Sequence, residues 1–60
     1  MTKTQFRDAL ERLGLTQGQA ALRMGYTIKM VNNYATGREP IPLVVSSLVE
    51  AWLKHGLPKI

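Results

Sequence analysis

The hydrophobic and polar positions of this chain repeat with the period of an α-helix in four successive stretches. The stretches are separated by Gly14, Gly25, Gly37 and Gly56. Glycine commonly follows the last residue of a helix, because it adopts the left-handed backbone conformation there at little cost. No stretch shows the two-residue alternation of a half-buried strand. The pattern therefore predicts an all-α fold, a compact bundle of four short helices.

The first two stretches each combine an apolar face with a candidate N-cap. In the first, Thr4 is the candidate cap. Apolar residues then follow at helical spacing, at Phe6, Ala9, Leu10 and Leu13. In the second, Thr16 and Gln19 have the spacing of a capping box, in which each side chain bonds to the backbone of the other residue. Ala20 and Ala21 are small enough to let another helix approach closely.

The third stretch starts at Thr27, another good N-cap, and has two contrasting sides. Val31, Tyr34 and Ala35 share the apolar side. The opposite side collects Ile28, Lys29, Asn32, Asn33 and Thr36. Adjacent asparagines are poor choices for a helix interior, because their amides compete for backbone hydrogen bonds. Their presence indicates that this side is selected for something other than helix formation.

The fourth stretch is apolar over an unusually wide arc. Pro42 is expected at its first helical position, and the helix should end near His55. Its apolar residues span roughly 200°, about twice the width that one core face needs. They are Val44, Val45, Leu48, Val49, Ala51, Trp52 and Leu53. We expect two partners for this helix, the core and a second subunit. Trp52 is assigned to the core edge, and the expected dimer contacts are Val49, Leu53, Leu57 and Ile60.

Composition narrows the class of protein. The 60 residues suffice for one small domain, 1–60. The net charge is +4 and the isoelectric point about 10.0, which favours nucleic acid, an anionic membrane or an acidic partner. The absence of cysteine excludes a disulfide framework and suits a reducing cytoplasm. No apolar run approaches the length of a membrane span, and the first residues lack the apolar core of a signal peptide. A soluble cytoplasmic domain without membrane contact is expected.

The chain offers no arrangement typical of an enzyme. Ser46 and Ser47 lie inside the predicted fourth helix, two turns or more from His55, so no nucleophile is paired with a base. The segment "GLTQG" lacks the Lys-Ser/Thr of a phosphate-binding loop, and one histidine cannot form a zinc site alone. We therefore expect a binding module with no catalytic residue, cofactor, metal or small-molecule substrate.

The segment "TQGQAALRMGYTIKMVNNYATG" resembles the helix-turn-helix of the phage repressor and Cro family. The resemblance covers residues 6 to 53 and implies a lambda-repressor-like fold. The matching positions are Thr16, Gln17, Ala21, Gly25, Thr27, Val31, Tyr34 and Gly37. In such a motif Ala21 lies where the two helices cross, Gly25 makes the left-handed turn, and Val31 fills the angle between the helices. This chain departs from the family at Ala35, where a glutamate in a buried salt bridge is common.

The resemblance also implies which residues bind. In this family the third helix lies in the major groove of DNA, with its N-terminal residues at the base edges. Asparagine pairs with adenine, lysine reaches guanine, and an aliphatic side chain contacts the thymine methyl. The implied base-reading residues are Ile28, Lys29 and Asn33, with Asn32 beside them on base or phosphate. The implied phosphate contacts are Gln17, Thr27, Thr36 and Arg38, with Arg23 a weaker candidate.

These inferences predict a sequence-specific regulator of transcription that binds double-stranded DNA. The closest functional type is a phage or prophage repressor, Cro-like, acting as a homodimer on a two-fold operator. The dimer forms either in solution or only on DNA. One alternative is a protein-interaction adaptor or antitoxin-like module with the same fold that does not read DNA. Another, a basic amphipathic membrane peptide, is disfavoured by the four glycine-bounded helices.

Overall fold

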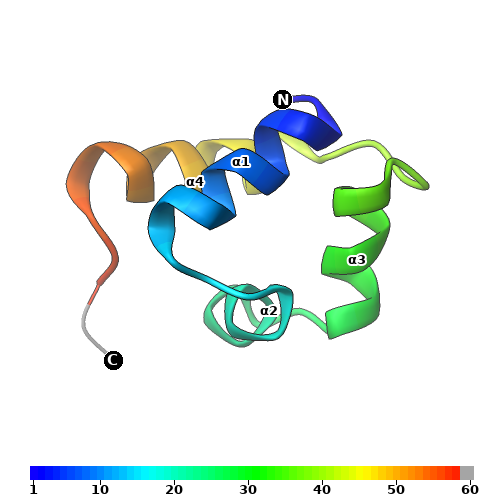
Figure 1. Cartoon of the computed structure of the whole chain (residues 1–60), viewed down its shortest axis with the longest axis horizontal. Helices are drawn as coiled ribbons and strands as arrows, with labels where there is room; N and C mark the ends of the chain where they lie inside the picture. Colours follow the sequence, from blue (N-terminus) through cyan, green and yellow to red (C-terminus); the bar gives the residue numbers. More distant parts are fainter. Residues whose placement is uncertain (59–60) are drawn as a thin grey trace.

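The computed structural model describes residues 1–58 and contains four α-helices (Figure 1). These are α1 (Lys3–Leu13), α2 (Gln17–Met24), α3 (Ile28–Thr36) and α4 (Leu43–His55). The all-α prediction is confirmed, because these residues contain no strand. None of the four helices combines the length and the apolar character needed to cross a membrane.

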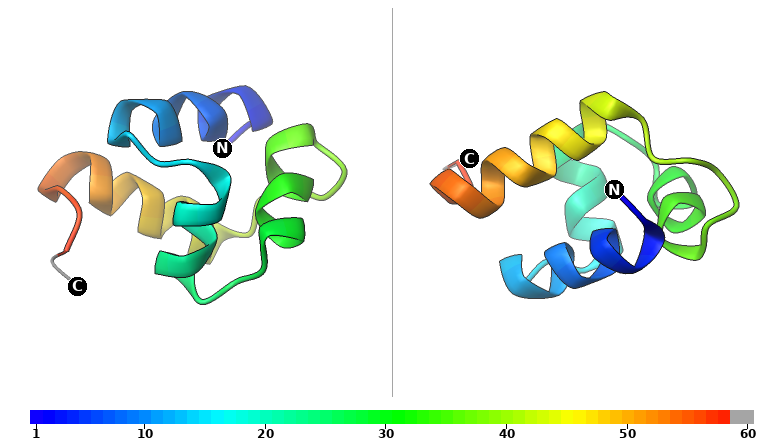
Figure 2. Two further views of the ribbon diagram at one scale, coloured as in Figure 1. Left: turned by 60° about the horizontal axis from the view of Figure 1, so that its bottom comes forward. Right: turned by 90° about the horizontal axis from the view of Figure 1, so that it is seen from above.

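The helices pack so that α3 stands at one end of the molecule (Figures 1 and 2). α1 and α4 lie side by side and run in the same direction, and α1 also contacts α3. α2 packs against α3. The start of α1 comes close to the end of α3, whereas the end of α4 lies at the far side of the molecule. One long side of α3 is therefore not covered by another helix.

All four helices contribute to one hydrophobic core. Phe6 of α1 is completely buried and packs edge-to-face on Tyr34 of α3, with ring centroids 6.2 Å apart and an interplanar angle of 84°. The remaining buried hydrophobic residues are Ala9, Leu10, Ala20, Ala21, Val31, Ala35, Val45, Val49 and Trp52. The predicted apolar faces are thus the ones that meet. Ala35 is fully buried and neutral, so the core holds no carboxylate at this position.

Hydroxyl caps fix the starts of the first three helices. The predicted capping box of α2 is confirmed, with Thr16 and Gln19 exchanging bonds of 3.1 and 2.9 Å. The Thr27 hydroxyl accepts from the Met30 amide at 3.2 Å, as expected for an N-cap. Pro42 was predicted to be the first residue of α4. It is instead the N-cap, one position before the helix begins at Leu43.

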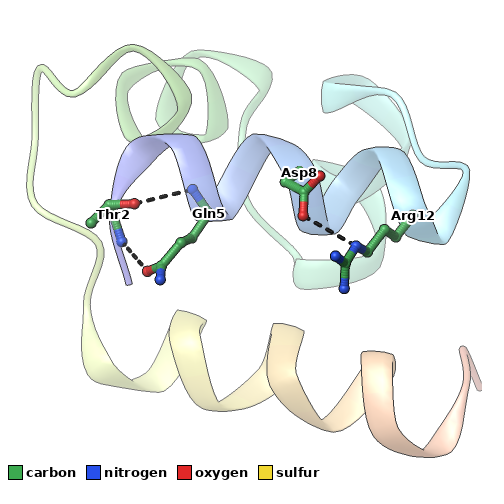
Figure 3. A network of polar contacts seen from close by, with 4 residues as sticks. All are labelled: Thr2, Gln5, Asp8 and Arg12. Carbon is green, nitrogen blue, oxygen red and sulfur yellow. Dashed lines mark hydrogen bonds and ion pairs between the residues drawn. The ribbon is translucent and has the colours of Figure 1, made fainter.

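The cap predicted for α1 was wrong. Thr2, two residues earlier than Thr4, caps the helix (Figure 3). Its hydroxyl accepts from the Gln5 amide at 3.1 Å, and the Gln5 carboxamide oxygen accepts from the Thr2 amide at 2.9 Å. Thr4 cannot form this reciprocal pair, because Arg7 stands three residues on and has no acceptor. The helix consequently begins at Lys3.

A tight glycine turn sets the angle between α2 and α3. Gly25 has φ 75° and ψ 24°, the left-handed conformation expected for it. The amide of Tyr26 donates to the carbonyl of Ala21 at 2.9 Å, and the amide of Gly25 donates to that of Leu22 at 3.4 Å. This pattern ends α2 and leaves only three residues before α3 starts. The two helices therefore have little freedom to change their relative orientation.

The fourth helix corrects the expected dimer contacts. Val49 is 0% exposed and belongs to the core, so its assignment to a dimer contact was wrong. Leu57 packs against the core of its own chain, which makes it a poor contact as well. Leu53 keeps 40% of its surface exposed, and Ile60 lies outside the described residues. The most exposed aliphatic side chains of α4 are instead Leu43, at 81%, and Val44, at 72%.

Candidate nucleic-acid interface

The uncovered side of α3 carries the side chains predicted to bind DNA. Because Val31, Tyr34 and Ala35 are buried, the helix turns its other residues outward. Lys29, Asn32 and Thr36 are exposed, Asn33 is half-buried, and Ile28 keeps 62% of its surface. The structure therefore brings all four predicted base-reading residues onto one surface, together with Thr36.

Asn32 and Gln17 are joined by a hydrogen bond between the two helices. The Asn32 side-chain amide donates to the Gln17 carboxamide oxygen over 3.1 Å. This bond leaves the Gln17 amino group able to donate and the Asn32 oxygen able to accept. The start of α2 and the outer side of α3 thus form one continuous polar surface.

Ile28 at the start of α3 packs against α2 near Gly18. A Cβ atom at position 18 would lie 3.6 Å from Cδ1 of Ile28, an ordinary van der Waals distance, so alanine would also fit there. Leu22, Tyr26 and Thr27 line the same hollow. The 78% exposure of Leu22 at the edge of this hollow has no explanation in the structure.

The N-terminus of α2 offers backbone donors beside Gln17. Thr16 and Gln19 satisfy each other's amides, and the amide of Ala20 donates to the Thr16 carbonyl at 2.9 Å. The amides of Gln17 and Gly18 lie in the first turn, where a helix has no carbonyl to offer them. Such amides, at the positive end of the helix dipole, favour an anion such as phosphate.

Thr27, Thr36 and Arg38, three of the four remaining phosphate candidates, differ in their surroundings. The Thr27 hydroxyl accepts one bond and keeps its own proton to donate. Thr36 donates its hydroxyl to the Asn32 carbonyl at 2.9 Å, so this proton is already used within the helix. Arg38 is exposed directly after the end of α3.

Arg23 does not belong to this surface. Its guanidinium donates to the carbonyl of Pro58 at 2.9 Å and so joins α2 to the end of the described chain. Leu57 lies close by, in a hollow shared with Leu13 and Leu15. Arg23 therefore fixes the C-terminal segment, and the structure separates it from the other phosphate candidates.

The charge distribution of this part of the chain favours a polyanion. From Arg12 to Arg38 the sequence contains four basic residues and no Asp or Glu. The only ion pair found among residues 1–58 joins Arg12 to Asp8 on α1, at 3.1 Å. Neither α2 nor α3 therefore presents a carboxylate that would repel phosphate.

The phenol of Tyr34 reaches the surface while its ring is part of the core. Burial of the ring raises the pKa of this phenol above its ordinary value, and Tyr26 and Glu39 raise it further. Within the described chain it has no hydrogen-bond partner, yet no buried polar side-chain atom is left unsatisfied. Its oxygen is therefore accessible, and at neutral pH it carries a proton to donate.

Some features of this surface escaped the sequence analysis. The Gln17–Asn32 bond and the Gly18–Ile28 contact depend on the angle between α2 and α3. This angle cannot be predicted from a local sequence pattern. No family model, curated protein or solved structure matches the chain.

Proposed function

We propose that this chain is a sequence-specific regulator of transcription that binds double-stranded DNA, a phage or prophage repressor of the Cro type. α2 and α3 act as a helix-turn-helix, and α3 enters the major groove. One observation carries the proposal. The uncovered side of a helix at the end of the molecule bears a lysine and two asparagines, which are good base-reading residues and poor helix formers.

The geometry suggests a distinct role for each side chain on α3. Asn33 is the best candidate for a bidentate bond to adenine, because its side-chain amide makes no hydrogen bond within the described chain. Lys29 can reach the acceptors of guanine. Ile28, whose side chain packs beside Gly18, can contact a thymine methyl. Asn32 is bonded to Gln17, so we assign it to positioning that glutamine as well as to contact with DNA.

Contacts to phosphate then come from both sides of the turn. Gln17 and the free amides of the first turn of α2 hold one phosphate. The hydroxyl of Thr27 and the guanidinium of Arg38 supply further donors. These contacts fix the register of α3 in the groove without reading sequence.

A two-fold operator would require two copies of this chain. Successive half-sites on one face of DNA lie about 34 Å apart, and the described residues of each copy supply one helix α3. The exposed Leu43 and Val44 at the start of α4 supply apolar surface for a two-fold homodimer, whereas Leu53 lies on the opposite side of this helix from Val44.

Selection from a random duplex library at physiological salt tests the proposed function. We expect enrichment of a two-fold motif whose half-sites lie about 10 base pairs apart. If a single half-site is enriched without its symmetric copy, the proposal of sequence-specific DNA binding stands and the proposal of a dimer fails. If the protein melts cooperatively in circular dichroism but enriches no sequence, the proposal fails.

Val44→Asp should disrupt the dimer while leaving the fold intact, because Val44 is 72% exposed. We expect sedimentation to show two wild-type copies and one variant copy on the selected duplex, with at least tenfold weaker binding by the variant, or about 1.4 kcal/mol. Lys54→Gln changes the net charge by the same amount at the other end of α4 and should bind like the wild type. Two copies of Val44→Asp bound at wild-type affinity would contradict this placement of the dimer.

The exposed aliphatic residues of α4 also favour the alternative, a protein-interaction adaptor or antitoxin-like module. Salt dependence separates the two functions. A protein that neutralises several phosphates loses affinity steeply as salt rises, with a logarithmic slope of about −0.9 per contact. A docking module should bind duplex DNA weakly at every salt concentration.

A further inference from the structure

The side chain of Lys3 lies against the end of α3. A Cβ atom at Gly37 would be 2.8 Å from Cδ of Lys3 and 3.7 Å from its Nζ. The lysine stem therefore fills the space that a side chain at position 37 would occupy. Gly37 has φ 81° and ends α3 in the left-handed conformation, which favours glycine at this position.

The backbone of Lys3 is held in place by the cap of α1. Lys3 is the first residue of the helix, directly after Thr2, and the reciprocal bonds between Thr2 and Gln5 fix this turn (Figure 3). Two views place the start of α1 beside the end of α3 (Figures 1 and 2). The capped turn therefore fixes the backbone of Lys3 at a position from which its side chain lies over Gly37.

A lysine here is unfavourable for its own helix. Cations at a helix N-terminus oppose the dipole, and the first turn of α1 has no acidic residue to offset the charge. The last turn of α3 has no basic residue of its own. The ammonium of Lys3 lies beside Gly37 at the C-terminal end of α3, where the helix dipole favours a cation.

The ammonium group of Lys3 has no acidic partner among residues 1–58, where the salt bridge of Arg12 with Asp8 stands alone. Arg38 follows Gly37 directly, so two exposed cations flank the same glycine. This pair lies at the end of α3, whereas Gln17 contacts Asn32 further back along the helix.

We propose that Lys3 is a phosphate-binding residue of the DNA interface, which acts with Arg38 at the end of α3. The aliphatic part of the Lys3 side chain packs over Gly37, and the ammonium contacts the DNA backbone as a point charge. The assignment rests on the proposed function and extends it, because it adds a contact from α1 to a surface otherwise formed by α2, α3 and the following loop. This contact carries affinity rather than sequence preference.

Salt titrations with matched charge variants test the assignment. The probe is a mixed-sequence duplex of about two helical turns, bound by the wild type, Lys3→Gln, Lys3→Arg and Lys54→Gln. Lys54 lies in the last turn of α4, far from α3 (Figure 1), so its variant removes the same charge elsewhere. Thermal melting by circular dichroism confirms that each variant is folded.

We expect Lys3→Gln to flatten the logarithmic salt slope by about 0.9. The ratio of the wild-type affinity to the Lys3→Gln affinity should accordingly fall about 3.5-fold when the salt concentration rises fourfold. Lys3→Arg and Lys54→Gln should keep the wild-type slope. An unchanged slope in Lys3→Gln, or an equal change in Lys54→Gln, overturns the assignment while DNA binding stands. A folded wild type that binds no duplex at any salt overturns the proposed function and this contact together.

Discussion

Replacing Phe6 with alanine should remove a large part of the free energy of unfolding of this domain. The side chain is 0% exposed and joins α1 to α3 through Tyr34. Removing a buried phenylalanine costs about 3–5 kcal/mol in lost burial and cavity formation. The total stability of a domain this small is about 3–9 kcal/mol at 0.05–0.15 kcal/mol per residue. Urea denaturation followed by circular dichroism measures the loss directly.

Two controls separate the effect of the cavity from that of substitution itself. Phe6→Leu retains much of the side-chain volume and should lose less than half as much stability. Arg7→Ala, at the neighbouring exposed position, should change stability by no more than about 0.5 kcal/mol. If Phe6→Ala and Arg7→Ala unfold at the same urea concentration, the core is not organised around this ring.

Asn33→Ala should weaken binding to the selected operator by about 1–3 kcal/mol, a factor of about 5 to 150, and relax the preference at one base pair. The reason is loss of a bidentate pair with adenine. Fluorescence titration against the operator, its single-base variants and random duplex measures both effects. The loss should be large on the operator and small on random DNA.

Unfolding would not explain this loss. Alanine favours a helix by about 0.5 kcal/mol over asparagine, so the variant should melt at or above the wild-type temperature. Asn32→Ala is the informative comparison, because it also releases Gln17 from its 3.1 Å bond and should weaken operator and random DNA alike. Equal losses on both kinds of DNA from Asn33→Ala would remove it from the base-reading residues.

Local sequence patterns were sufficient for most of the helix boundaries. Thr16 with Gln19, and Thr27, are caps whose partners lie three residues away, so the interaction is written in the sequence itself. The start of α1 obeys the same rule at Thr2 and Gln5. Thr2 was the better candidate than Thr4, because Gln5 follows Thr2 three residues on whereas Arg7 follows Thr4.

Contacts between helices were beyond local reasoning. The apolar arc of α4 indicated two partners, yet only packing against α1 decides which part of the arc faces the core. That packing buries Val49 and leaves Val44 exposed. The Lys3–Gly37 contact joins residues far apart in the sequence and depends on how α1 meets α3. The side chains on α3 were predictable from its period, whereas Gln17 as a partner of Asn32 was not.

The helix caps of this protein are uncharged hydroxyl groups, so its fold depends little on charge, whereas the proposed binding of DNA depends on it. Helix starts are often capped by aspartate, which would add negative charge and tie folding to pH. Here Thr2, Thr16 and Thr27 perform this task without charge. Within residues 1–58 the one ion pair lies on the exposed surface of α1, where it contributes little. The fold should therefore change little in stability over a wide range of ionic strength, so that a salt titration of the proposed DNA binding reports on the contact with DNA and not on unfolding.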